Sequence, residues 1–294
     1  MSFLASVNGE ITPAEEARVS VLDNGFTFGD SVYETLRTYK GRPFRLDLHL
    51  RRLRTSAGRL AIEIPVDDPA LARSLEALLA RAQNPESYIR MIVSRGVGDI
   101  SYRFERVKGP TIVLAVKPYE PPPEIEYQEG VPVAVVSVRR NHPDALDPAI
   151  KSCNLLNNVL AVREAQKSGA SEAILLNQRG EVAEGASSNL FIVREGRVVT
   201  PPLSAGILPG ITRIIVLDLC RSQGIPSAEE TVSLPDLLGA EEAFLTSTIR
   251  EVLPIRAVDG RPIGTGRPGP LTAKLLSALR ADANSEVPVG GSGR

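Results

Sequence analysis

The 294-residue sequence has few of the residues from which metal sites and disulfide frameworks are built. It contains two cysteines, Cys153 and Cys220, and two histidines, His49 and His142. This set provides no cluster with the spacing of a zinc site, and two cysteines cannot make a disulfide framework. We therefore expect no metal ion, and we expect the reducing cytoplasm as the location of the protein.

Strong charge of one sign and long apolar runs are also lacking. The chain has 34 basic and 35 acidic residues, a formal net charge of −1, so it lacks the basic surface that nucleic-acid binding requires. No apolar run approaches the roughly 18–20 residues that span a bilayer, and the first residues have no basic segment typical of a signal peptide. We expect neither a nucleic-acid partner nor a membrane association.

Common catalytic motifs are missing as well. The sequence contains no G-x-x-x-x-G-K-[ST] phosphate loop and no G-x-S-x-G turn. Gly96-Val-Gly98 begins like a dinucleotide-binding fingerprint, but Ser101 stands in place of its third glycine. An enzyme of this composition is therefore expected to take its chemistry from a bound cofactor.

The 43% of hydrophobic residues suffice for a packed core, and the length favours about two domains. Periodicity in the first part predicts strands mixed with helices, which indicates an α+β unit. Strands are expected at a hairpin around Asn8-Gly9 and at 18–22, 31–39, 42–46, 88–94 and 111–116, with helices at 47–60 and 68–82.

A proline-rich segment follows and divides the chain. Four prolines between Lys117 and Glu124 predict a stiff connector. The second part predicts strands at 131–138, 173–176, 189–193 and 242–246, with helices at 154–168 and 211–223. We expect a mixed α+β or α/β protein with a small domain at 1–117, a linker at 118–130, a large domain at 131–280 and a flexible tail at 281–294.

The second part also holds the groups that a pyridoxal phosphate site requires: an amine, a carboxylate for the pyridine nitrogen, and an anion cradle. Lys151 precedes a predicted helix, and Glu184 lies in a polar turn before a strand. Gly210-Ile-Thr-Arg opens a helix whose free amides favour anions, and Thr246-Ser-Thr ends a strand. Taken singly, each also fits an ordinary surface, capping or edge residue.

Together these segments resemble a known family, the class IV or fold-type IV pyridoxal-phosphate aminotransferases. That family includes branched-chain and D-amino-acid aminotransferases and aminodeoxychorismate lyases. The resemblance runs from about Val7 to Val258. Its motifs are Phe28-Gly-Asp-Ser-Val-Tyr-Glu, His49-x-x-Arg52-Leu-x-x-Ser56-Ala57, Lys151-Ser-x-Asn154-Leu, Glu184-Gly-x-x-Ser188-Asn189-Leu-Phe, Gly206-Ile-Leu-x-Gly210-Ile-Thr-Arg and Thr246-Ser-Thr248.

The resemblance implies a two-domain fold-type IV enzyme, usually a homodimer in which the partner contributes loops to the pocket. It implies that Lys151 is the catalytic residue, linked covalently to pyridoxal 5'-phosphate and moving a proton during the reaction. It implies that Glu184 pairs with the pyridine nitrogen and that Arg52 clamps the phosphate. The remaining implied cofactor contacts are Leu208, Ile211, Thr212, Ser247 and Thr248.

The implied reaction moves an amino group from an amino acid to a 2-oxo acid with ping-pong kinetics. Branched-chain or broad L-amino acids are favoured, since Tyr88-Ile-Arg90 and Arg37 resemble the branched-chain enzymes, although Thr35 and Leu156 depart from their pattern. The expected substrate-binding residues are Tyr33, Arg37, Tyr88, Arg90 and Arg103.

Three other functions stay open. Lys151-Ser-Cys-Asn-Leu-Leu resembles the D-amino-acid enzymes, but Ile100 and Tyr102 stand where those enzymes carry an arginine and a histidine that bind the substrate carboxylate. Thr35 and Ser94-Arg-Gly-x-Gly98 resemble the lyases. The third alternative is a non-catalytic protein, with or without the cofactor.

Overall fold

The computed structural model describes residues 2–285 of the chain, which form two compact units. The first unit holds residues 2–120 together with the short segment 150–154. The second holds residues 121–149 and 155–285. Segment 150–154, which contains Lys151, follows the expected linker in the sequence but belongs to the first unit. The chain therefore passes between the two units more than once. Both units mix helices with β-sheet, as the sequence predicts.

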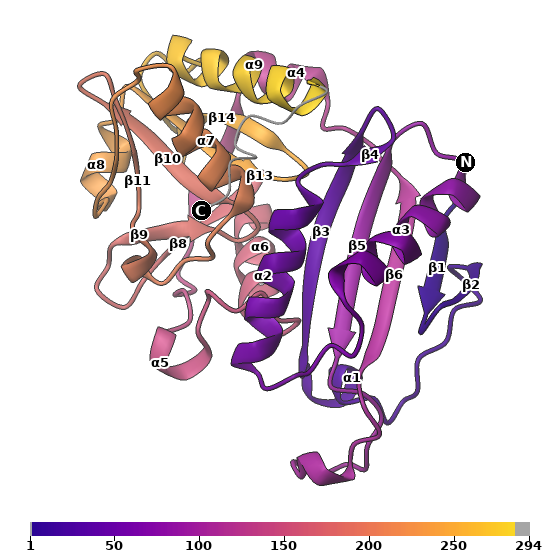
Figure 1. Ribbon diagram of the computed structural model, residues 1–294. Helices are drawn as coiled ribbons and strands as arrows, with labels where there is room; N and C mark the ends of the chain where they lie inside the picture. The colour runs from indigo at the N-terminus through magenta and orange to yellow at the C-terminus, as the bar shows by residue number, and fades with distance from the viewer. Residues whose placement is uncertain (1, 286–294) are drawn as a thin grey trace. The chain divides into compact units, whose positions relative to one another are not determined.

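Within the described residues, the first unit is built on a six-stranded sheet of order β2-β1-β6-β5-β3-β4. Figure 1 shows two long helices lying across one face of this sheet. The elements are β1 (Leu4–Val7), β2 (Glu10–Pro13), α1 (Asn24–Phe28), β3 (Ser31–Tyr39), β4 (Arg42–Pro43), α2 (Leu46–Arg59), α3 (Asp68–Ala82), β5 (Ser87–Ser94), the 3-10 turn η1 (Phe104–Arg106) and β6 (Thr111–Pro118).

Alternation along β3 sets the two faces of this sheet. Val32 and Leu36 are fully buried and pack with apolar residues of α2 and α3, whereas Tyr33 and Thr35 are half-buried on the opposite face. Helix α3 contributes Leu71, Leu75 and Leu78 at helical spacing, which places them on one face against the sheet. The predicted helices, the first hairpin and the strands at 31–39, 88–94 and 111–116 are confirmed.

Two strand predictions in the first unit are wrong. Residues 18–22 form no strand: Val19 and Val21 are exposed, so the polarity alternation there has no sheet to face. The strand predicted at 42–46 stops at Pro43, and Arg45 turns into the left-handed region at φ 52° before α2 begins. Proline carries no N–H for a sheet ladder, which shortens the pairing.

The second unit is built on a nine-stranded sheet, counted within residues 2–285, of order β12-β11-β10-β13-β14-β7-β8-β9, with β15 pairing to β14. Its elements are α4 (Glu124–Glu129), β7 (Val131–Val135), α5 (Pro143–Leu146), α6 (Leu156–Lys167), β8 (Glu172–Leu176), β9 (Val182–Gly185), β10 (Asn189–Arg194), β11 (Arg197–Thr200), the 3-10 turn η2 (Leu203–Ala205), α7 (Ile211–Ser222), β12 (Ser227–Glu229), α8 (Leu234–Leu238), β13 (Glu242–Ser247), β14 (Glu251–Val258), β15 (Arg261–Pro262) and α9 (Pro270–Asn284).

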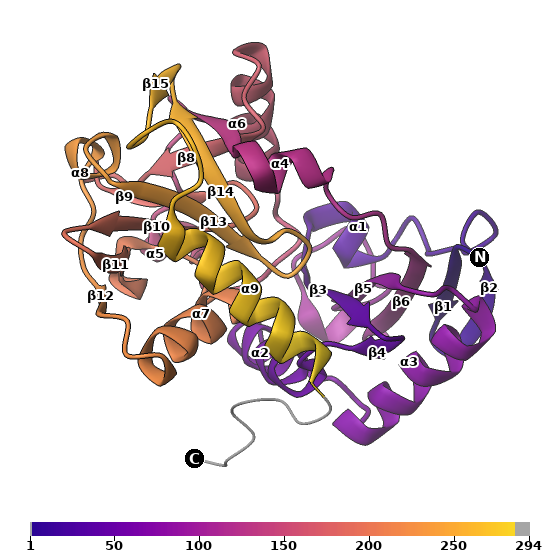
Figure 2. The ribbon, with the colours of Figure 1, turned by 90° about the horizontal axis from the view of Figure 1, so that it is seen from above.

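The central strands of this sheet are apolar on both faces. Strands β8, β10 and β13 are buried at nearly every position, which explains their continuous hydrophobic sequences. Figure 2 shows α9 beside β13 and β14, and α9 also contacts α7. Buried Glu242 of β13 accepts hydrogen bonds from the backbone N–H groups of Leu271 and Thr272, which fixes the first turn of α9.

The sequence boundaries and the structural ones differ at two places. Residues 124–129 of the expected linker form α4, and residues 281–284 of the expected tail form the end of α9. Leu275 and Leu279 of α9 are buried, so apolar packing carries the helix past the point where the composition turns polar. The rest of the expected tail, 286–294, lies outside the described residues. No helix within 2–285 is long and apolar enough to cross a membrane.

Candidate active site

Lys151 lies on the edge of the first unit's sheet. Its carbonyl accepts a hydrogen bond from the Tyr33 N–H at 2.9 Å, and the Cys153 N–H donates to the Ser31 carbonyl at 2.9 Å. The Lys151 N–H donates to Ser56 Oγ of α2 at 3.1 Å. Segment 150–154 therefore adds to the edge of β3, and this pairing fixes the backbone from which the lysine projects.

The Lys151 amine lies over an aromatic ring that also carries an arginine. Lys151 Nζ is 4.3 Å from the centroid of the Tyr33 ring, and the Arg90 guanidinium carbon is 3.6 Å from the same centroid. Arg90 Nη1 donates to Thr35 Oγ1 at 3.1 Å, and Arg90 forms no ion pair with a carboxylate within residues 2–285. Burial raises the pKa of Tyr33, and the Arg90 charge partly opposes this. The Tyr33 ring thus contacts both the lysine amine and a cation that has no carboxylate partner in the described part of the chain.

Beneath this face lies a buried ionic cluster of Glu34, Arg52 and His49. Arg52 donates from Nε and Nη2 to the two carboxylate oxygens of Glu34, each at 2.7 Å. His49 Nδ1 is 2.6 Å from Glu34 Oε2. Burial alone would raise the pKa of Glu34, but Arg52 and His49 lower it to about 2. Burial lowers the pKa of His49 against the opposing effect of Glu34. The cluster fixes the guanidinium plane of Arg52.

The other substrate residues expected from the sequence are placed differently. Arg37 stacks over the rings of Tyr39 and Tyr119 and donates to the Tyr119 hydroxyl at 2.9 Å. Tyr88 lies opposite Arg37 in the ladder between β3 and β5, further along the face that carries Tyr33. Arg103 is exposed on the loop between β5 and β6. Of the expected substrate residues, the structure brings Tyr33 and Arg90 together with Lys151.

Glu184 of β9 is buried in the second unit and held by several donors. Its carboxylate accepts from the Leu208 N–H at 3.0 Å and from Asn189 Nδ2 at 3.0 Å. Arg140 Nε is 2.8 Å from Glu184 Oε1. The buried carboxylate is thus bonded by a backbone amide, a side-chain amide and a guanidinium. Arg140 has no motif around it, so no sequence pattern predicts its place here; Asn189 stands inside the Glu184 motif, from which no role for it follows.

The start of α7 presents backbone amides beside this carboxylate. Gly210 is the N-cap residue and has no side-chain cap, and Ile211 and Thr212 of the first turn are buried. A Cβ at Gly210 would lie 1.9 Å from Asn189 Oδ1, so no larger residue fits between the helix start and β10. The end of β13 lies next to this region, because Asn189 pairs with Thr246 in the sheet.

Thr246, Ser247 and Thr248 carry hydroxyls at that strand end. Thr246 Oγ1 is buried and has no hydrogen-bond partner within residues 2–285. Ser247 Oγ accepts from the Arg250 N–H at 3.2 Å, which closes the turn that contains Thr248. The second unit thus gathers a buried carboxylate, an uncapped helix start and a row of hydroxyls, while Lys151 and Arg52 belong to the first.

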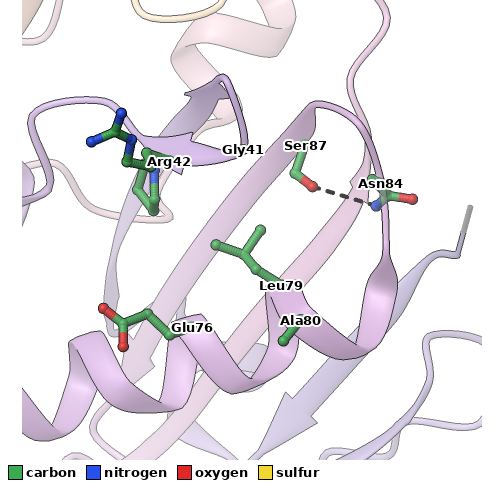
Figure 3. A pocket seen from close by; sticks show the side chains of 8 residues that line it. Gly41, Arg42, Glu76, Leu79, Ala80, Asn84 and Ser87 are labelled. Atoms are coloured by element: carbon green, nitrogen blue, oxygen red, sulfur yellow. Dashed lines mark hydrogen bonds between the residues drawn. The ribbon is translucent and has the colours of Figure 1, made fainter. Parts of the chain in front are cut away.

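A separate surface pocket lies between α3, β4 and the start of β5 (Figure 3). Asn84 Nδ2 donates to Ser87 Oγ at its rim. None of its lining residues is a site residue expected from the sequence. The lining residues are Gly41, Arg42, Pro43, Glu76, Leu79, Ala80, Asn84 and Ser87.

Comparison with known proteins identifies the class. Residues 31–258 match the family model for amino-transferase class IV, which is most of the chain. The chain therefore belongs to the class IV aminotransferases and is an enzyme of this family, as the resemblance of the sequence implies.

Individual relatives bear names of two substrate types. A protein of Methanocaldococcus jannaschii, provisionally named a branched-chain-amino-acid aminotransferase, is 40% identical over 93% of this chain and 94% of its own. The D-alanine aminotransferase of Bacillus licheniformis is 37% identical over 95% and 97%. The structure of the branched-chain amino acid aminotransferase from T.th. with pyridoxamine 5'-phosphate is 30% identical, covers 98% of this chain and 96% of that one, and has a TM-score of 0.91.

Proposed function

We propose that this chain is a pyridoxal 5'-phosphate-dependent transaminase that acts on branched-chain or other L-amino acids. Lys151 would be the catalytic residue, and Arg90 would bind the substrate carboxylate. The observation that carries this assignment is the pair of cations on the Tyr33 ring, Lys151 Nζ at 4.3 Å and Arg90 at 3.6 Å.

The residues present fit the cofactor. The buried Glu184 carboxylate, held in place by its donors, suits a protonated pyridine nitrogen. Among the described residues, the start of α7 has no side-chain cap and the Thr246 hydroxyl has no partner, so both suit a phosphate group, together with Ile211, Thr212, Ser247 and Thr248. Arg52 would add a cation and Leu208 an apolar contact to the ring. The bound cofactor would supply an electron sink that stabilises charge at the substrate α-carbon.

The chain's own groups would divide the work as follows. Arg90 holds the substrate carboxylate, which places the α-carbon for the lysine. Lys151 removes the α-proton, holds it and later returns it. Hydrogen bonds to β3 and to Ser56 fix the backbone from which the amine projects, and this keeps the amine in position. Tyr33 excludes water from one side of the amine and orients Arg90. Two substrates bind in turn at one site, so ping-pong kinetics follow.

A D-amino-acid transaminase is the second candidate. The 37% identity to a D-alanine aminotransferase favours it. Ile100 and Tyr102, in place of the arginine and histidine expected of such enzymes, count against it. Handedness depends on which side of the cofactor carries the cation that binds the carboxylate.

We further propose a homodimer located in the cytoplasm. For the dimer, the support is a set of exposed apolar side chains of the first unit, on α1 and on the loop after β5, with Phe26 and Ile100 each 75% exposed and Tyr102 85% exposed. Exposed apolar side chains of this size are typical of association surfaces. Static light scattering at micromolar concentration tests the dimer: a monomer mass would contradict it.

A half-reaction absorbance experiment tests the function. The purified holoenzyme is mixed with L-leucine, D-alanine or (R)-1-phenylethylamine, without a 2-oxo acid, and the spectrum of the bound cofactor is followed. We expect rapid conversion by L-leucine alone. Conversion by D-alanine would favour the second candidate. A holoenzyme that none of the three amines converts would overturn the transaminase proposal and favour a lyase.

A further inference from the structure

We infer that Glu172 and Arg250 are positioning residues that hold two turns of the cofactor site in register. The pair belongs to no motif that the sequence analysis singled out. The inference rests on the proposed function, because the two turns are those that carry Glu184 and the hydroxyls of Ser247 and Thr248.

Glu172 begins β8, and its side chain is 2% exposed. One carboxylate oxygen accepts hydrogen bonds from Ser187 Oγ at 2.7 Å and from Ser188 Oγ at 3.2 Å. The other accepts from the Ala173 N–H at 3.1 Å. Both serines belong to the turn that directly follows Glu184. A buried carboxylate thus fixes this turn through two hydroxyls.

The same turn leaves no room for rearrangement. A Cβ at Gly185 would lie 2.3 Å from Ser188 Oγ and 3.3 Å from Cγ of Glu172. The Gly185 N–H donates to the Ser188 carbonyl at 2.7 Å. Because the backbone passes this close to Glu172, a shift of the carboxylate moves the turn.

Arg250 connects the carboxylate to the second turn. Its Nη2 donates both to Glu172 Oε2 and to Ser187 Oγ, and its side chain is 20% exposed. Its backbone closes the turn after β13, since the N–H donates to Ser247 Oγ and the carbonyl accepts from the Tyr127 hydroxyl at 3.3 Å. One residue therefore belongs to the hydroxyl-bearing turn by its backbone and to the Glu184 turn by its side chain.

Sheet register explains why the two turns meet. Strands β10 and β13 are antiparallel neighbours, and Asn189 at the start of β10 pairs with Thr246 near the end of β13. The turn before β10 and the turn after β13 thus lie at the same end of this strand pair. The sheet brings them together, and the ion pair sets their spacing. Without the Arg250 side chain, Glu172 still holds the Glu184 turn through Ser187 and Ser188, whereas the hydroxyl-bearing turn loses its tie, so phosphate binding weakens more than ring binding.

The test compares two ligands of the apoenzyme, pyridoxal 5'-phosphate and pyridoxal, which lacks the phosphate. Arg250→Gln removes the charged donor. We expect the Kd for pyridoxal 5'-phosphate, measured by absorbance titration, to rise about tenfold, as for other residues that orient binding groups. The Kd for pyridoxal should change less than about twofold, because no phosphate contact is involved. Arg250→Lys keeps the charge and should recover most of the affinity.

Arg194→Gln is the matched control. Arg194 is the last residue of β10, at the other end of the strand from Asn189, and its guanidinium pairs with Asp236 at 2.7 Å. The Arg194→Gln substitution should lower the melting temperature without changing the Kd for either ligand. If Arg250→Gln does not fold, Glu172→Gln, which removes the charge of the same ion pair and keeps an oxygen for the two serines, serves in the same comparison.

Equal weakening of both ligands, or a lower melting temperature with both Kd values unchanged, would overturn the positioning role and leave the proposed function intact. A wild-type apoenzyme that binds neither ligand would overturn the proposed function, and this inference with it.

Discussion

The guanidinium of Arg52 binds the carboxylate of Glu34 through two parallel hydrogen bonds of 2.7 Å, in the interior of the first unit. Glu34 faces α2 from β3, on the side opposite to Tyr33. Neighbouring residues of one strand thus serve the two faces of the sheet: Glu34 orients the arginine proposed for the phosphate, and Tyr33 contacts the lysine. The geometry makes the following predictions.

Glu34→Gln should destabilise the protein in a pH-dependent way. The pKa of Glu34 is about 2 in the folded state, against an ordinary value of 4.5. A lowered folded pKa stabilises the fold above pH 4.5, and this contribution is lost as the pH falls from about 4.5 toward 2. We expect a loss on the order of 3 kcal/mol at pH 7, from urea unfolding. The difference from wild type should shrink at acidic pH.

Asp68→Asn is the control for this prediction. It removes a carboxylate that pairs with Arg54 of α2 at a more exposed position. Such a pair contributes up to about 1 kcal/mol. Equal losses of unfolding free energy from Glu34→Gln and Asp68→Asn would show that the buried Glu34 cluster stabilises the fold no more than a more exposed ion pair.

Arg90→Gln should raise the KM for the amino acid about tenfold or more, while kcat changes by less than about threefold, because a lost charge-assisted hydrogen bond costs about 1.5–3 kcal/mol of binding. Steady-state kinetics with L-leucine and 2-oxoglutarate measure both constants. Arg37→Gln and Arg103→Gln test the rival cations. If either of them raises KM and Arg90→Gln does not, Arg90 is not the carboxylate-binding residue.

Glu184→Gln should lower kcat by about a hundredfold or more, since a neutral amide cannot keep a proton on the pyridine nitrogen. The side chain retains its shape and an oxygen for the Leu208 N–H but leaves the buried Arg140 without its carboxylate, so the rate is compared at a temperature below the variant's own melting transition. Single-turnover absorbance with L-leucine measures the rate. Glu181→Gln, which removes a carboxylate paired with Arg179 near the surface, should keep the wild-type rate. A Glu184→Gln enzyme as fast as wild type would refute the role.

Local patterns predicted most elements of the fold. The period of four and three residues in Leu71, Leu75 and Leu78 gives the same helix that the structure has. The pattern failed at 18–22, where alternation carries no information about whether a partner strand exists. It also failed at 281–284, where burial of Leu275 and Leu279 on the sheet carries α9 further than composition suggests.

Short motifs in the sequence single out some candidate site residues, and packing brings others beside them that no motif indicates. Lys151, Glu184 and the Gly210 turn stand in contiguous motifs. Arg140 and Glu172 reach the site from residues distant in the sequence, and only the β-sheet registers bring them there. The choice among Arg37, Arg90 and Arg103 likewise needs the ladder, because it opposes Arg90 to Thr35 and leaves Arg37 between two tyrosines.

Segment 150–154 bears on how such a gene can be recombined. Its lysine is encoded among the residues of the second unit but rests on β3 of the first. A crossover between two relatives within 118–130 would join the lysine of one parent to the β3 edge and Ser56 of the other. Chimeras that keep the lysine with its support inherit 150–154 from the same parent as residues 31–56, so an exchange within 118–130 requires two further exchanges, one on each side of 150–154.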